Sequence, residues 1–149
     1  MSKAEEAIRS FSGNYNCAQS VLSVFSPELG LDRKTSLKVA TPFGGGIAHM
    51  DELCGAVTGA LMVLGLRHGM FKDEDLAAKE RTYALCQEFA VKFKSRNSSL
   101  KCTQLIGLNL SIPEDYEEAK EEDVFNQVCT KSVRDAVEIL EELLEQSNS

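Results

Sequence analysis

The spacing of apolar residues constrains the fold of this chain most, because it is helical almost everywhere and nowhere alternates as in a half-buried strand. The clearest stripe has the i, i+4, i+7, i+11 period of one helix face packed on a core: Val133, Val137, Leu140 and Leu144. With 149 residues, 43% of them hydrophobic, the chain can bury one core without covalent cross-links. We therefore predict an all-α fold, a single-domain helical bundle of about five to seven helices over residues 1–149.

Local signals give expected limits for these helices. Before the C-terminal helix we expect spans at about 4–11, 17–25, 34–40, 51–66, from 73 past 93, and 99–106. Asp51 and Asp73 are expected to act as N-caps, because a carboxylate at that position accepts backbone N–H bonds, and residues 97–99 are expected to cap the short helix. Three prolines are each expected where a helix stops: Pro27, Pro42 and Pro113.

Charge excludes one class of partner. A formal charge of −7 and a pI near 4.9 argue against nucleic acid, whose phosphates need a basic face. The excess is local, since residues 114–145 contain twelve acidic side chains and three basic ones. We expect these to form the solvated face of C-terminal helices, with an acidic docking surface for a basic partner as the alternative.

Neither a membrane nor an export signal is expected. The longest apolar stretch, Ala56–Leu66, is too short to cross a bilayer. The first residues lack a basic region leading into an apolar segment, so we expect no signal peptide and a cytoplasmic location.

Five cysteines occur without a single CxxC pair, so any chemistry that they share must be assembled by the fold. In a reducing cytoplasm an odd number of cysteines indicates thiols, metal ligands or a reversible redox pair rather than a disulfide framework. Cys17, with Asn14 or Asn16 as the N-cap, and Cys102 are expected near helix starts, whereas Cys129 alone indicates little. Cys86 shares a helix face with Phe89 and Phe93 and is expected in the core.

A glycine-rich loop precedes the fourth expected helix. Gly44, Gly45 and Gly46 make this backbone permissive, and Cys54 would be the third helical residue after Asp51. There, the helix N-terminus would stabilise a thiolate. The loop could also hold an anionic ligand.

The same helix presents a face of small residues, including Gly55 and Gly59. Either a cofactor or another helix could approach this face closely. Glycines in a helix interior cost roughly 1 kcal/mol each, which such an approach would offset. A homodimer through the face is a further expectation.

The pattern resembles a family of redox-active proteins named for a C-GCAxxG-C-C signature. The resemblance runs through Asn16-Cys17-Ala18, Phe43–Gly46, the Cys54–Gly59 block, Ser99–Cys102 and Cys129. The block reads Cys-Gly-Ala where the family name has Gly-Cys-Ala. The resemblance implies a mostly helical domain with a redox role and a four-cysteine site, made by position of Cys17, Cys54, Cys102 and Cys129.

The family is also similar to a domain of haem-containing split-Soret cytochromes, which implies an iron–sulfur centre at the four cysteines. A 2Fe–2S cluster is the preferred occupant, because four thiolates suit it and small residues beside Cys54 leave room. Zinc would use the same ligands without redox chemistry and is less favoured. The chain has no CxxCH, so no covalent haem c is expected.

Two other function classes stay open. In the first, the chain is a metal-free thiol–disulfide protein in which Cys54 or Cys17 is the activated, catalytic thiolate and a neighbouring cysteine resolves the intermediate. In the second, it is a structural or small-ligand-binding bundle in which Gly44, Gly45, Gly46, Gly55 and Gly59 hold the ligand. The redox partner is unknown from the sequence. His49, five residues before Cys54, is expected to be an ordinary loop histidine, with a proton donor or an auxiliary ligand as the alternatives.

Overall fold

Helices make up almost all of the regular structure in the computed structural model, which describes residues 1–146. In chain order they are α1 Lys3–Ser12, α2 Cys17–Phe25, η1 Ser26–Leu29, α3 Arg33–Ala40, η2 Thr41–Phe43, α4 Gly44–Ile47, α5 Gly55–His68, α6 Leu76–Asn97, α7 Cys102–Ile106, α8 Pro113–Glu121, η3 Phe125–Cys129 and α9 Thr130–Gln146. Within these residues the single β feature is an isolated antiparallel bridge between Leu53 and Lys101. The all-α bundle expected from the apolar spacing is confirmed.

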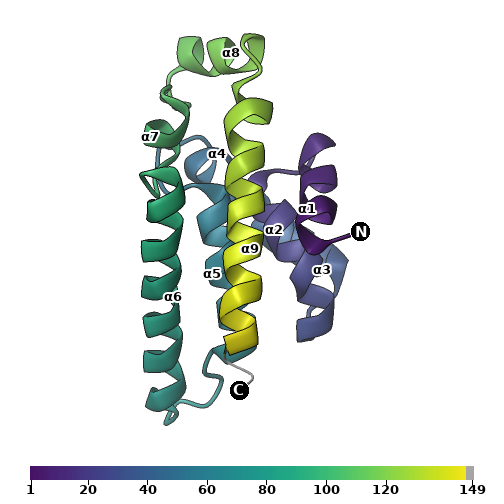
Figure 1. Cartoon of the computed structure of the whole chain (residues 1–149), viewed down its shortest axis with the longest axis vertical. Coiled ribbons are helices and arrows are strands. Elements are labelled where there is room, and N and C mark those ends of the chain that lie inside the picture. The colour runs from purple at the N-terminus through teal and green to yellow at the C-terminus, as the bar shows by residue number, and fades with distance from the viewer. Residues whose placement is uncertain (147–149) are drawn as a thin grey trace.

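Three long helices form the body of the bundle. α5, α6 and α9 run side by side, α1 to α3 cover one flank, and α8 crosses one end (Figure 1). The predicted stripe on α9 faces the core, since Val133, Val137 and Leu140 are fully buried. Phe89 and Phe93 of α6 are fully buried as well. None of the helices between residues 1 and 146 is long and apolar enough to cross a membrane.

The small-residue face of α5 is taken by α2. A Cβ at Gly59 would lie 2.8 Å from the carbonyl oxygen of Ala18, so only glycine allows the two helices to come this close. Of the two expected occupants of this face, another helix is therefore the one observed. The same contact covers the surface on which the homodimer expectation rested.

The predicted start of α5 is wrong. Asp51 does not cap it, because the chain first makes a left-handed turn in which Gly45, Gly46, Ile47, Ala48 and His49 all have positive φ. α5 begins only at Gly55, and Cys54 is its N-cap residue rather than the third residue of the helix. Three of the five turn residues carry a side chain, so sequence patterns for glycine turns do not reveal it.

Other helix limits differ by smaller amounts. Asp75, not Asp73, caps α6 and accepts a hydrogen bond from the backbone N–H of Ala78 at 3.2 Å. The predicted cap at residues 97–99 is also wrong, since α6 runs to Asn97 and α7 starts at Cys102. Pro113 begins α8 instead of ending a helix, which is a favourable place for proline because its missing N–H has no partner there.

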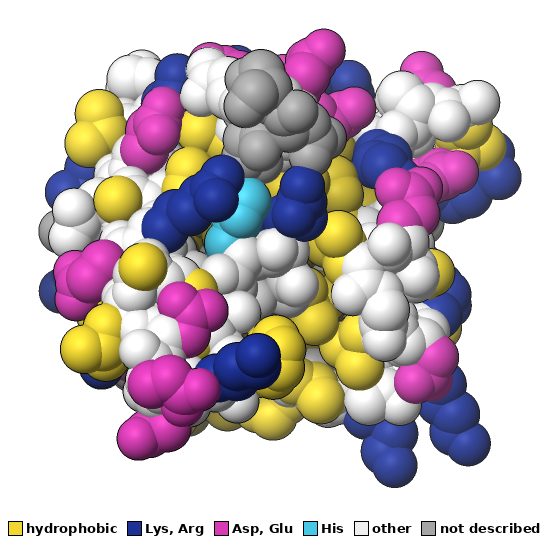
Figure 2. Space-filling model, turned by 90° about the horizontal axis from the view of Figure 1, so that it is seen from below, with side chains coloured by type: hydrophobic (Ala, Val, Ile, Leu, Met, Phe, Trp, Pro, Cys, Tyr) yellow, Lys and Arg dark blue, Asp and Glu magenta, His cyan; other side chains and the backbone are white. Residues whose placement is uncertain are grey.

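Ion pairs join the acidic face of α9 to α6. Glu142 pairs with Lys92 at 2.7 Å, and Glu138 pairs with Arg96 at 2.8 Å. The nearly buried Asp135 also pairs with Arg96, at 3.3 Å. At the end of the bundle opposite α8, acidic, basic and apolar side chains are interspersed (Figure 2).

Candidate functional site

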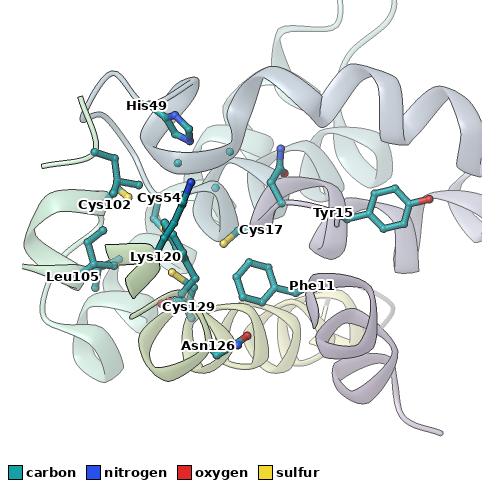
Figure 3. Close-up of a pocket in the computed structure, with 18 of the residues that line it drawn as sticks. Phe11, Tyr15, Cys17, His49, Cys54, Cys102, Leu105, Lys120, Asn126 and Cys129 are labelled. Carbon is teal, nitrogen blue, oxygen red and sulfur yellow. The ribbon is translucent and has the colours of Figure 1, made fainter. Parts of the chain in front are cut away.

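The four cysteines of the expected site line one cavity of about 820 Å³. Each is buried and lies at a helix boundary: Cys17 begins α2, Cys54 precedes α5, Cys102 begins α7 and Cys129 ends η3. Figure 3 shows the four side chains around the same space. Cys86 lies in the middle of α6, half-buried and outside this lining. All five cysteines are free.

Cys17 is placed by a capping box. The side-chain oxygen of Asn16 accepts from the N–H of Gln19 at 2.8 Å, and the side chain of Gln19 accepts from the N–H of Asn16 at 2.9 Å. Asn16 also donates to the carbonyl of Thr41 at 2.9 Å, which ties the start of α2 to η2. Of the two N-caps that the sequence allows, Asn14 and Asn16, the structure uses Asn16, which holds Cys17 at the first helical position.

Cys54 and Cys102 are placed together by the isolated bridge. The N–H of Cys54 donates to the carbonyl of Leu100 at 2.8 Å, and the N–H of Cys102 donates to that of Glu52 at 3.1 Å. Because side chains alternate along a strand, the two cysteines share one face of the bridge as diagonal neighbours, and such positions are roughly 7–8 Å apart.

The left-handed turn supports this pair from the other side. A Cβ at Gly46 would lie 2.9 Å from the Cβ of Cys102 and 3.0 Å from the backbone nitrogen of Glu52. Gly46 also has a φ of +72°, a conformation that glycine adopts at no cost. The turn therefore brings its backbone directly against Cys102.

Cys129 ends a π-helical turn, η3, that leads directly into α9. Such turns are rare and occur frequently at functional sites, because the extra residue re-aims the side chains around it. Nothing in the local sequence indicates this turn. The family resemblance alone implies that Cys129 belongs to the four-cysteine site.

Burial is the main cause of the shifted pKa values of two thiols, Cys54 and Cys102. It raises the pKa of Cys54 to about 12, although the N–H groups of Ala56 and Val57 at the start of α5 act in the opposite direction. It also raises the pKa of Cys102 to about 12, with smaller contributions from Cys54, Cys129 and Asp51. The expectation of a stabilised thiolate at Cys54 is therefore wrong. The free-energy cost of burying the charged thiolate exceeds the stabilisation that the helix N-terminus provides.

Cys17 and Cys129 form a hydrogen-bonded pair in which the two pKa values shift in opposite directions. The thiol of Cys17 donates to the sulfur of Cys129, which raises the pKa of Cys17 and lowers that of Cys129. Burial adds to the rise at Cys17 and opposes the fall at Cys129. The group favoured as a thiolate is thus Cys129, not Cys54 or Cys17 as expected from the sequence.

The donor set suits a thiophilic metal centre, but not a single ion as the side chains stand. Within residues 1–146, no three His, Cys, Asp or Glu side chains are grouped closely enough to hold one metal ion. The thiols are instead held in two ways: Cys17 is hydrogen-bonded to Cys129, and Cys54 and Cys102 lie on the two sides of the isolated bridge. A 2Fe–2S cluster fits this arrangement, because each of its two irons takes two thiolates.

The cavity has a further wall that sequence reasoning missed. It includes Tyr116 and Lys120 of α8, and Phe11 of α1. Proline at the first helical position with Glu114 and Asp115 in the first turn is the signal that could have revealed α8.

The five glycines predicted to hold a ligand do not all lie at the cavity. Gly44, Gly45 and Gly55 line the cavity, whereas Gly46 supports Cys102 from behind and Gly59 packs against α2. Whether any of them contacts a ligand stays a prediction.

Comparison with known proteins gives one match. Neither the curated proteins nor the solved structures contain a significant relative of this chain. One family model, described as "Putative redox-active protein (C_GCAxxG_C_C)", matches residues 15–143. The matched region includes all four cysteines of the cavity and most of the chain. The chain therefore belongs to the C_GCAxxG_C_C family.

Proposed function

We propose that this chain is an electron-transfer protein that holds a 2Fe–2S cluster on Cys17, Cys54, Cys102 and Cys129. The observation that carries the proposal is the convergence of four buried thiols on one cavity, two of them joined by a hydrogen bond and two held by one backbone bridge. Zinc, the usual alternative for four thiolates, needs all four at one tetrahedral point, and the two pairs would have to move together to provide it.

The protonation of the thiols supports a metal centre. Cys54 and Cys102, each with a pKa of about 12, are protonated at neutral pH and are therefore poor nucleophiles by themselves. Metal coordination removes the proton from a thiol and supplies the positive charge that the buried thiolate lacks. These two cysteines are better suited to coordination than to thiol exchange.

The chain's own residues would bind the cluster and protect it from water. The N–H groups of Ala56 and Val57 act to lower the pKa of Cys54 and would stabilise negative charge on its sulfur. Leu105, Ile106 and Leu110 give part of the cavity an apolar lining, which keeps water away from the sulfurs. When bound, the cluster would supply a reversible one-electron redox centre.

The test is metal analysis of protein purified without oxygen. We expect about two iron and two sulfide per chain, with visible absorption typical of a cluster. Cys54→Ser and Cys102→Ser should each lose most of this iron. Cys86→Ser is the matched control, since Cys86 lies outside the cavity, and it should keep the wild-type content. Zinc without iron, or iron that Cys54→Ser retains in full, would contradict the proposal.

The Cys17–Cys129 pair supports a second candidate, a thiol–disulfide function. The Cys129 thiolate would attack a substrate disulfide and form a mixed disulfide, releasing one substrate thiolate. Cys17 would then lose its proton and attack the Cys129 sulfur, releasing the second substrate thiol and leaving a Cys17–Cys129 disulfide. Two electrons pass to the substrate, and two thiols of the protein are oxidised.

Thiol counting distinguishes this candidate. After mild oxidation of metal-free protein, the second candidate predicts the loss of two thiols and a cross-linked peptide pair that contains Cys17 and Cys129. Random pairing that includes Cys86, or no pairing at all, would contradict it.

A further inference from the structure

The cysteine cavity is larger than a cluster requires. A 2Fe–2S core contains four atoms, whereas the cavity measures about 820 Å³ and lies in the range of roughly 300–1,000 Å³ typical of sites for organic ligands. Beyond the four cysteines, the lining includes Phe11 of α1, Tyr15, His49 and Lys120 of α8, which are labelled in Figure 3.

One wall of this space is a row of rings. The ring centroids of His49 and Tyr116 are 4.6 Å apart at an interplanar angle of 41°, and those of Tyr116 and Phe125 are 6.2 Å apart. His49, Tyr116 and Phe125 come from the left-handed turn, α8 and η3, so three separate elements converge to build the row. Aromatic walls of this kind accept a flat ring by stacking or edge contact.

The backbone of His49 adopts a strained conformation. It ends the left-handed turn with a φ of +63°, a conformation that costs roughly 1–2 kcal/mol for a residue with a Cβ. Its ring lies over Gly45, where a Cβ would be only 2.2 Å from the Cδ2 atom of His49. Strained backbone of this type is retained mainly at functional sites.

One ammonium group faces the same space. Lys120 of α8 lines the cavity and is drawn with its nitrogen toward His49 in Figure 3, and its Nζ lies 5.0 Å from the Tyr116 ring centroid. Its other partner is the exposed Glu117 at 3.4 Å, a weak surface pair. Lys120 can therefore donate a hydrogen bond to a carbonyl oxygen of a ring stacked on Tyr116.

The charges beside the cavity disfavour anions. Residues 113–123 contain seven acidic side chains and a single lysine, and one of the acids, Asp123, lines the cavity itself. The other six acids are not among the lining residues, so the excess negative charge of this segment acts on an anion from beside the cavity and disfavours it relative to an uncharged molecule.

We propose that the outer part of this cavity binds an uncharged planar aromatic carbonyl compound, stacked on Tyr116 and His49 with a carbonyl oxygen on Lys120. Its role as a redox partner of the cluster rests on the proposed function. The binding itself rests on the cavity, the ring row and Lys120.

The test uses two flavins that share one ring system. Lumiflavin is uncharged, and flavin mononucleotide carries a phosphate. By equilibrium dialysis against oxygen-free protein at low salt, we expect lumiflavin to bind at micromolar concentrations and flavin mononucleotide at least about tenfold more weakly. The difference in affinity between the two flavins should become smaller as added salt screens the acidic residues. No lumiflavin binding, or tighter binding of flavin mononucleotide, would overturn the proposal.

The chain offers a matched control for the residues. Tyr83 and Lys79 on α6 form the same lysine–tyrosine pair four residues apart, with Nζ 5.8 Å from the ring, away from the cavity. Lys120→Gln and Tyr116→Leu should each weaken lumiflavin binding at least about tenfold, whereas Lys79→Gln and Tyr83→Leu should not.

Lys120 is exposed, so its variant should fold. Unchanged binding in Lys120→Gln would overturn the proposal. Iron content measured on the same samples separates the two claims, since lost flavin binding with intact iron bears on the ligand site alone.

Discussion

At the scale of single residues, the four cavity thiols are chemically distinct. The hydrogen bond from Cys17 lowers the pKa of Cys129, while burial raises the pKa of Cys54 and of Cys102 to about 12. Alkylating reagents react with the thiolate. In reduced, metal-free protein at neutral pH we therefore expect iodoacetamide to modify Cys129 well before Cys54 and Cys102, as followed by peptide mass spectrometry.

Cys86 serves as the reference in that experiment, because it is half-buried and outside the cavity. Equal rates at Cys54 and Cys129 would show that the hydrogen-bonded pair does not exist in solution. Unfolding the protein in denaturant should bring all five rates together, since the differences come from the fold.

Single residues also show where sequence reasoning succeeds. Asn16 was recognisable as an N-cap because its partners lie three residues away in the chain, and local chemistry decided the outcome. Asp51 has an equally suitable side chain, but its φ of +62° belongs to a different turn. Tertiary contacts against Cys102 and Glu52 dictate that turn, so no local pattern could reveal it.

At the scale of elements, the left-handed turn positions the site. Gly46→Ala should be more destabilising than Gly107→Ala, although both glycines have a similar positive φ, +72° and +78°. Each substitution should cost about 1 kcal/mol from the backbone conformation. At Gly46 the new Cβ also collides with Cys102 and the backbone of Glu52, and overpacking adds about 1–3 kcal/mol, whereas nothing lies within 4 Å at Gly107.

Thermal unfolding followed by circular dichroism checks this difference. We expect Gly46→Ala to melt several degrees below Gly107→Ala, since about 1 kcal/mol corresponds to roughly 2–4 °C or slightly more at this chain length. Equal melting temperatures would mean that the turn can move away from Cys102, and that it does not fix the site.

Helices with a local apolar or capping signal were predictable, including the short α1, α2 and α3, whereas α8 and η3 were not. The α9 stripe was confirmed because its four residues face one continuous core. α8 is not predictable in this way, because its first residue is a proline, which in the sequence indicates a helix stop, and because its single buried side chain, Ala119, gives no periodic signal. η3 packs against α7 and leads into α9, and no local sequence pattern records that packing.

At the scale of the whole molecule, the buried thiols make stability depend on pH. The folded protein keeps the protons of Cys54 and Cys102 up to about pH 12, while an unfolded chain releases them near the ordinary value of 9.0. Above that value the folded state binds more protons than the unfolded state, so the free energy of unfolding falls as pH rises. We predict that reduced, metal-free protein loses stability between about pH 9 and 12.

Urea denaturation across that range without oxygen measures the effect. Lysines and tyrosines titrate there too, so the informative quantity is the difference between wild type and a Cys54→Ser, Cys102→Ser double variant. The double variant should lose less stability per pH unit. Parallel pH dependences of the two proteins would show that these thiols are not buried as described.

The convergence of the four cysteines is also a property of the whole molecule. They begin or end four different elements, and only the packing of these elements brings the sulfurs to one cavity. Spacing in the chain could exclude a CxxC site but could not place Cys129 beside Cys17. The family resemblance supplied the set of residues, and the fold supplies the division into two pairs.

Iron-edge X-ray absorption on protein purified without oxygen tests that central claim most directly. The account predicts that iron has sulfur neighbours only in its first shell, with a second iron as the next neighbour, because two thiolate pairs hold a two-iron core. Nitrogen or oxygen ligands in the first shell, or iron without an iron neighbour, would contradict it.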